Sequence, residues 1–221
     1  MKLFIKVTYS ILILFLLLSC ESDITDVIEY PTTPVIDYAI QYNIDIGNIE
    51  EYLKTHSLTV VNHSGFSDDQ EAIFETVPRL DFNSIWGSNP NSPKPSLLTK
   101  FKTIEGVHHK IYYIKFRDGI GTSPNDNNQL TSYYKGFLLD DTVFDQSIET
   151  GRTFRLNELI LGWREILPEF KMGITTGLDQ YEDFGAGVMF LPSALGYYQH
   201  SVGQIPEYSP IIFNFKVFKV F

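Results

Sequence analysis

The stretch Tyr134–Asp145 reads Y-K-G-F-L-L-D-D-T-V-F-D, and it is the most informative part of this 221-residue chain. Its alternation predicts two strands joined by a turn at Asp140-Asp141, with Phe144 and Asp145 on the returning strand. A tryptophan, Trp163, follows shortly after it. A Tyr, a Phe and a carboxylate beside a Trp would form an apolar pocket with a few polar groups, which is typical of a ligand-binding site.

The segments around this hairpin carry further strand signals and one helical pattern. The helical stretch is Gly162–Phe170, whose apolar residues recur at helical spacing and whose Pro168 lies near the first turn. Several antiparallel strands with one short helix packed across them make an α+β fold. We expect the strands at Lys110–Arg117, Leu130–Leu138, Thr142–Asp145, Thr153–Leu156 and Ile211–Phe221.

Residues 1–19 read as a secretory signal peptide. Lys2 and Lys6 supply its positive end, and Ile11–Leu18 is an apolar run too short to span a bilayer. The run ends at Leu17-Leu18-Ser19-Cys20, which resembles a bacterial lipobox. In that kind of signal the peptide is removed before the Cys, and the Cys carries the lipid. The alternative is an ordinary signal peptide with an incidental Cys.

Cys20 is the only cysteine, so no intrachain disulfide is possible. With several acyl chains on Cys20, the mature chain would be stably anchored to a membrane. Glu21 follows the Cys, and the usual Gram-negative sorting pattern then argues against retention in the inner membrane. We therefore expect a lipid-anchored protein of the bacterial cell envelope, at the outer membrane, facing either the periplasm or the outside. Residues 20–38 are acidic, contain prolines and lack periodicity, which predicts a flexible tether.

The net charge of the full chain is −10. This charge argues against nucleic acid as a partner and against electrostatic adhesion to anionic lipid. The sequence leaves the oligomeric state open.

Residues 39–109 are interpreted as an N-terminal extension of unknown role. Its clearest element is a helix at Ile40–His56, with Ile44, Ile49, Tyr52 and Leu53 near one face. Leu58–Val61 is a short β-branched run. Asn83–Ser96 is rich in turn formers and predicts an irregular exposed loop.

From Tyr112 to Phe221 the chain resembles the FKBP family of peptidyl-prolyl cis/trans isomerases. Four blocks in order carry the resemblance: Y-K-G-F-L-L-D-D-T-V-F-D-Q-S, G-R-T-F-R-L-N-E-L-I-L-G-W, L-G-Y, and Q-I-P-E-Y-S-P-I-I-F-N-F-K-V. With the lipobox, the chain is similar to the FKBP-type lipoproteins of gliding-bacterium envelopes. The resemblance implies an FKBP-like, half-wrapped antiparallel sheet over residues 110–221.

The resemblance also implies a binding pocket for a proline ring. Trp163 would form its floor, Asp145 would be its carboxylate, and Tyr197 would offer a hydroxyl to a ligand carbonyl. Tyr134, Phe144, Phe154 and Phe213 correspond to aromatic walls, and Leu159, Ile160 and Ile205 to aliphatic ones. The backbone amide of Ile160 would be a second donor to bound peptide.

Such a pocket fits the chemistry of an X–Pro bond. The isomers differ little in energy, yet a barrier of about 18–20 kcal/mol separates them. An apolar cleft disfavours the charge separation of the planar amide and so favours the twisted one, with no nucleophile, metal or cofactor. We expect proline-containing polypeptide clients in the envelope. The alternative is a non-catalytic module that grips a proline segment of a partner.

Three features depart from the family pattern or compete with it. Asp140-Asp141 stands where the family usually has an acidic residue and Gly, so the turn type is expected to differ. Gly173–Leu191 is longer than compact family members need and predicts an extended hairpin or added loop, with a turn at Gly185-Ala186-Gly187. His108-His109 could suggest a metal, but no third ligand lies at a supporting spacing, so we interpret both as solvated loop residues.

Overall fold

The computed structural model describes residues 36–62, 70–88 and 95–221. The described residues all belong to the second of the chain's two units, Val35–Phe221. The signal peptide, Cys20 and the tether as far as residue 35 lie outside the described residues. No helix in the described part is long and apolar enough to cross a membrane.

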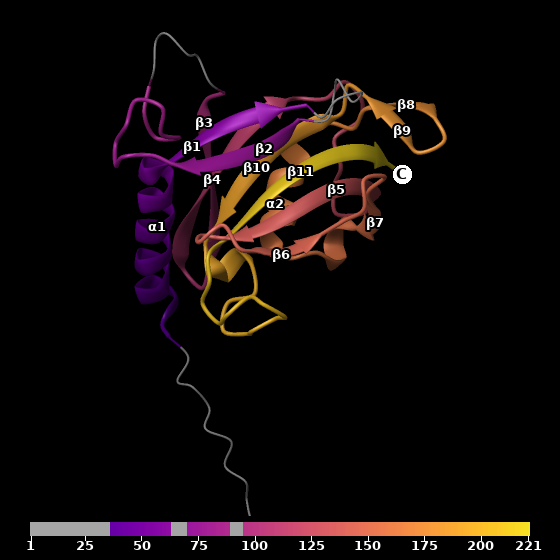
Figure 1. Cartoon of the computed structure of the whole chain (residues 1–221). Coiled ribbons are helices and arrows are strands. Elements are labelled where there is room, and N and C mark those ends of the chain that lie inside the picture. The colour runs from indigo at the N-terminus through magenta and orange to yellow at the C-terminus, as the bar shows by residue number, and fades with distance from the viewer. Residues whose placement is uncertain (1–35, 63–69, 89–94) are drawn as a thin grey trace, which may run out of the picture. The chain divides into compact units, whose positions relative to one another are not determined.

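A seven-stranded antiparallel sheet is the centre of the second unit (Figure 1). Its order is β3-β4-β10-β11-β5-β6, and β7 pairs with the same edge of β5 as β6 does. The strands are β3 (Leu97–Ile104), β4 (Val107–Arg117), β5 (Gln129–Leu138), β6 (Val143–Gln146), β7 (Arg152–Arg155), β10 (Gly185–Leu191) and β11 (Ile211–Val220). This arrangement confirms the predicted α+β class, and the β5–β6 hairpin confirms the pairing read from the opening stretch.

Strand β11 is buried on both faces of the sheet because its side chains alternate between two cores. Phe213 and Phe215 belong to the core on the α2 side, whereas Ile212 belongs to the core on the opposite side. Between them, the Asn214 side chain accepts a hydrogen bond from Ala72 N–H (3.2 Å) and donates one to Gly187 O (3.0 Å). The buried amide is therefore satisfied by two neighbouring strands.

The first core lies under helix α2 (Leu161–Ile166) and the 3₁₀ turn η2 (Leu167–Glu169) that continues it. The predicted helical stretch thus splits in two, with Pro168 among the first residues of η2, where a missing N–H costs little. Gly162 allows α2 to approach β10 closely, since a Cβ there would lie 2.4 Å from the Leu191 side chain. Two further 3₁₀ turns, η1 (Leu156–Glu158) and η3 (Ser193–Leu195), precede and follow this region.

The opposite face of the sheet is covered by helix α1 (Tyr38–Thr55) and the hairpin of β1 (His56–Val61) and β2 (Glu71–Thr76). Asp37 caps α1, because its side chain accepts hydrogen bonds from the N–H groups of the first turn. The buried face of α1 consists of Gln41, Asp45, Ile49, Tyr52 and Leu53. The prediction for Ile44 was wrong, since it is 49% exposed: two polar side chains occupy the buried face one turn apart.

The segment after α2 differs in part from its prediction. Strands β8 (Ile174–Gly177) and β9 (Gln180–Glu182) form the expected hairpin. Gly185-Ala186-Gly187 is not a turn, however, but the buried beginning of β10, a central strand. The run begins with two glycines and is followed by Pro192, and such residues are as typical of a turn as of the start of a buried strand.

The N-terminal part of the chain is joined to the sheet rather than separate from it. Strand β3 pairs with β4 along its whole length, and residue 110, where the sequence places the start of the FKBP-like domain, lies inside β4. The predicted exposed loop at residues 83–96 is also partly packed, because Ser84 and Ile85 are buried and Ser84 bridges to Ser57. Residues 89–94 of that loop lie outside the described residues.

The two histidines lie on β4 and not in a solvated loop, which corrects that prediction. His109 is 0% exposed, lies edge-on to Tyr42 at 4.8 Å, and pairs its Nδ1 with Val107 O at 3.0 Å. Its Nε2 has no hydrogen-bond partner in the described part of the chain. Burial lowers the pKa of His109 from its ordinary value, against the opposing effect of the Val107 carbonyl.

We expect His109 to make folding weaker in mild acid. As the pH falls below about 6.5, the unfolded chain takes up this proton before the folded chain does, so the free energy of unfolding decreases. In His109→Phe this part of the decrease should disappear. Urea unfolding between pH 5 and 7.5 measures it, with the exposed His108→Phe as the matched control. An unchanged pH dependence in His109→Phe would contradict a neutral buried His109.

Candidate active site

A cavity of about 440 Å³ opens between the β5–β6 hairpin, β7, the start of α2 and the loop that precedes β11. The sequence predicted ten site residues, and all ten line this cavity: Tyr134, Phe144, Asp145, Phe154, Leu159, Ile160, Trp163, Tyr197, Ile205 and Phe213. Four lining residues were not singled out from the sequence, namely Arg152, Glu158, Val202 and Gly203. Their positions on β7, η1 and the loop gave no signal of their own.

Trp163 stands at the centre of a ring of aromatic side chains. Its ring lies 5.1 Å from that of Phe213 and 5.5 Å from that of Tyr134, both edge-to-face, and 6.3 Å from that of Phe154. Phe144 in turn meets Phe213 edge-to-face at 5.5 Å. Edge-to-face contacts are the preferred aromatic geometry, so the rings hold one another in place without a ligand.

The polar groups of the cavity form a short chain. The Tyr134 hydroxyl donates to Asp145 Oδ2 at 2.7 Å, and Arg152 Nη1 donates to the Tyr134 hydroxyl oxygen at 3.5 Å. Asp145 Oδ1 accepts from Gln146 N–H at 2.8 Å. Burial first, and then the hydrogen bond to Asp145, raises the pKa of Tyr134 from its ordinary value, so this hydroxyl remains a donor at neutral pH. The hydrogen-bond partner that a pocket carboxylate requires is therefore present.

Two further donors of the cavity are not engaged. Within the described part of the chain, neither the Tyr197 hydroxyl nor the Ile160 N–H makes a hydrogen bond. Burial raises the pKa of Tyr197, and the charge of Asp145 adds to the effect. An apolar cavity with two free donors can accept a ligand that brings an apolar ring and carbonyl oxygens.

Gly136 gives Phe144 its place in the wall. A Cβ at Gly136 would lie 2.5 Å from two atoms of the Phe144 ring and 2.9 Å from the Phe213 ring. A side chain there would push the Phe144 ring out of its position, because real Cβ atoms do not approach so closely. The Y-K-G-F order of the opening stretch therefore has a packing reason.

Side chains at the end of α1 and the start of β1 contact the turn of the β5–β6 hairpin. Asp141 has a φ of +65°, the left-handed region that favours glycine. Its carboxylate accepts a hydrogen bond from the Tyr52 hydroxyl (2.6 Å) and lies 3.6 Å from His56 Nε2. These contacts stabilise an Asp where the family pattern expects Gly, and they fix the strand that carries Phe144.

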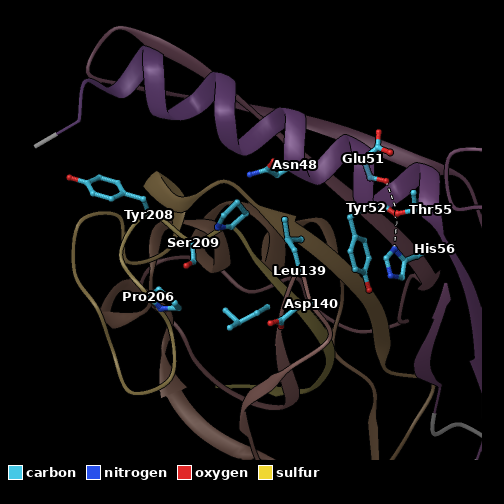
Figure 2. A pocket seen from close by; sticks show the side chains of 12 residues that line it. Asn48, Glu51, Tyr52, Thr55, His56, Leu139, Asp140, Pro206, Tyr208 and Ser209 are labelled. Carbon is cyan, nitrogen blue, oxygen red and sulfur yellow. Dashed lines mark hydrogen bonds between the residues drawn. The ribbon is translucent and has the colours of Figure 1, made fainter. Parts of the chain in front are cut away.

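A second, wider cavity of about 610 Å³ lies between α1 and the loop before β11 (Figure 2). Figure 2 shows Tyr208 and Pro206 on one side of it and Tyr52 and His56 on the other, with Asn48 and Glu51 above. It contains none of the predicted site residues. Among the described residues, no group of three or more His, Cys, Asp or Glu side chains could hold a metal ion.

Comparison with known proteins shows what the part of the chain around the cavity is similar to. Residues 121–218 match the family model for FKBP-type peptidyl-prolyl cis-trans isomerases, and all ten predicted site residues lie inside the match. This part of the chain is therefore similar to FKBP-type peptidyl-prolyl cis-trans isomerases.

Individual relatives match over a similar part of the chain. The FKBP-type peptidyl-prolyl cis-trans isomerase FkpA of Buchnera aphidicola is 31% identical over 55% of this chain and 47% of its own length. FkpA of Escherichia coli K12 is 32% identical over 55% of this chain and 43% of its own length. The crystal structure of FkpA from Escherichia coli superposes with a TM-score of 0.44 at 29% identity, covering 54% of this chain and 51% of that one. The chain thus spans somewhat less than half of the length of these two relatives.

Gly136→Ala should displace the Phe144 ring and leave the backbone of the sheet intact. We expect a loss of about 1–3 kcal/mol in the free energy of unfolding, because a methyl group overpacks the wall. Urea unfolding and aromatic NMR shifts of Phe144 and Phe213 measure both effects. Gly47→Ala, where a Cβ meets no atom within 4 Å, is the matched control and should raise stability by about 0.5–1 kcal/mol. An unmoved Phe144 resonance would contradict the close contact.

Proposed function

We propose that this protein is a peptidyl-prolyl cis/trans isomerase that assists the folding of envelope or secreted proteins. The observation that carries the proposal is the convergence of the ten family-matched residues on one cavity whose centre is Trp163. The family match over residues 121–218 supports it. The substrate is an X–Pro segment of a polypeptide client, with the proline ring packed against the Trp163 face.

Catalysis in this proposal is differential binding of the twisted amide. Resonance keeps the peptide bond planar and places negative charge on the carbonyl oxygen. The walls of Phe144, Phe154 and Phe213 remove water from the bond, which disfavours the charge-separated planar form and lowers the barrier to rotation. Trp163 holds the ring while the carbonyl on the other side of the bond turns.

The polar groups of the cavity then have distinct roles. The free Tyr197 hydroxyl and Ile160 N–H donate to client carbonyls and fix the register of the segment. Asp145 is held by Tyr134 at the rim of the aromatic walls. Its negative charge repels the carbonyl oxygen of the planar amide and so favours rotation away from it.

Trp163→Leu should lower kcat/KM for a proline peptide by about tenfold or more, since each 1.4 kcal/mol of lost transition-state binding is tenfold. Asp145→Val in the same chain should lower it further. Trp86→Leu is the matched control, because Trp86 is the other of the two tryptophans, is 39% exposed, and lies away from the cavity against Tyr112 and Lys54. A direct isomerisation assay over several X–Pro peptides measures the rates.

Wild-type turnover in the Trp163→Leu, Asp145→Val chain would contradict the proposed site. Tight peptide binding without turnover in the wild-type protein would instead favour a proline-segment binding module.

We propose further that Cys20 carries lipid and anchors the protein in the bacterial cell envelope, at the outer membrane. The motif Leu17-Leu18-Ser19-Cys20 after an apolar run supports the proposal. Incorporation of a labelled fatty acid in cells tests it, and Cys20→Ser should abolish both the label and the membrane fraction. Ser22→Ala is the control, and Glu21→Asp should move the protein towards the inner membrane. Fatty-acid label retained in Cys20→Ser would contradict the proposal.

A further inference from the structure

The loop between η3 and β11 carries four cavity residues, Tyr197, Val202, Gly203 and Ile205, but no helix or strand of its own. Tyr197 and Ile205 both lie in this loop and line the prolyl site. Inside the loop, Val202 and Ile205 form an isolated bridge, and Tyr198 N–H donates to Ser193 O at 2.9 Å. Its position over the cavity therefore depends on contacts with other elements.

The first of these contacts comes from a buried carboxylate of α1. Asp45 Oδ2 accepts hydrogen bonds from Ser193 N–H at 2.7 Å and from Ser193 Oγ at 2.6 Å. Gln41 Nε2 donates both to Asp45 Oδ1 (2.6 Å) and to Tyr208 O (3.3 Å). Asp45 and Gln41 thus contact Ser193 of η3, the turn that precedes the loop, and Tyr208 near the end of the loop.

A second contact lies at the first turn of α1. The ring of Tyr38 stacks on that of Tyr198 at 4.4 Å with a 9° tilt. The Tyr198 hydroxyl donates to Ile36 O, and Ile36 N–H donates to the Tyr208 hydroxyl at 3.2 Å. Tyr198 and Tyr208 both have positive φ, +50° and +56°, which non-glycine residues keep only when their surroundings hold them.

We propose that the N-terminal half of α1 positions the loop at residues 196–208 over the prolyl site, with Asp45 and Tyr38 as positioning residues. The catalytic meaning of the proposal rests on the proposed function. Tyr197 is the neighbour of Tyr198, so the stack and the hydroxyl bond fix the backbone next to the group that is free to meet a client carbonyl. Neither positioning residue lines the prolyl cavity.

Two observations separate this role from general packing of α1. Burial raises the pKa of Asp45 from its ordinary value, against the opposing effect of its hydrogen bonds to Ser193 and Gln41. A carboxylate that is 1% exposed costs more than an apolar side chain of similar size, so sheet packing alone does not explain it. The hydrogen bond of Gln41 and the ring stack of Tyr38 come from the first half of α1, whereas Asn48 and Glu51 farther along the helix face the open second cavity (Figure 2).

The test compares Tyr38→Ala and Asp45→Asn with Tyr112→Phe in the full chain. Tyr112→Phe is the matched control, because it removes a hydrogen bond between the C-terminal half of α1, at Glu50, and β4 (2.8 Å) without touching the loop. Tyr38 is only half buried, so its replacement leaves the core intact. The readouts are amide hydrogen exchange and the separate kcat and KM values of proline-peptide isomerisation.

We expect faster exchange of the amides between Gly196 and Tyr208 in Tyr38→Ala and Asp45→Asn, with β10 and β11 unchanged. In the same variants kcat/KM should fall by about tenfold to a hundredfold. A small displacement of the Tyr197 hydroxyl misaligns this donor with the carbonyl of the client. Tyr112→Phe should change neither readout.

Exchange that rises equally in the loop and in β10 and β11, or no more than in Tyr112→Phe, would overturn the proposal. The exchange experiment does not depend on turnover. Absent isomerase activity in the wild-type protein would therefore refute the proposed function, while the loop amides would still decide whether α1 positions the loop.

Discussion

The alternation of side chains along β11 is the constraint on which the rest of the structure depends. One strand presents Phe213 to the prolyl cavity and Ile212 to the core beneath α1, so the same backbone supports the site and the layer behind it. A shift of one residue in its pairing with β5 would exchange the two faces. The buried Asn214, bonded to both β2 and β10, fits only the observed register.

Much of the site could be predicted because four sequence blocks in order resemble a known family, and the resemblance implied all ten residues, whereas the residues alone indicated Tyr134, Phe144, Asp145 and Trp163. The hairpin, the helical spacing around Trp163 and the terminal strand each carry their own signal, and they converge on one cavity. Arg152 and Glu158 were missed because an Arg on a short strand and a Glu in a 3₁₀ turn are usually solvated surface residues. The other two lining residues that were missed, Val202 and Gly203, lie in the loop before β11 and belong to no motif.

Other elements could not be predicted, because they depend on contacts between residues that are far apart in the sequence. Strand β10 is an apolar run that begins with two glycines, and its pairing with β4 and β11 distinguishes it from a loop. His109 is buried because α1 lies over it, which no pattern within β4 reveals. In α1 the pattern misled, because Gln41 and Asp45 take buried positions that a helical wheel assigns to apolar side chains.

The position of β11 in the middle of the sheet has a consequence for how the molecule reaches its native state. β11 is synthesised after every other strand of the sheet, yet it pairs with β5, some eighty residues earlier in the chain, and with β10. Until it is added, the two halves of the sheet have unpaired edges that face each other. Because such non-local pairing forms slowly, we expect the sheet to be completed only after β11 has been synthesised.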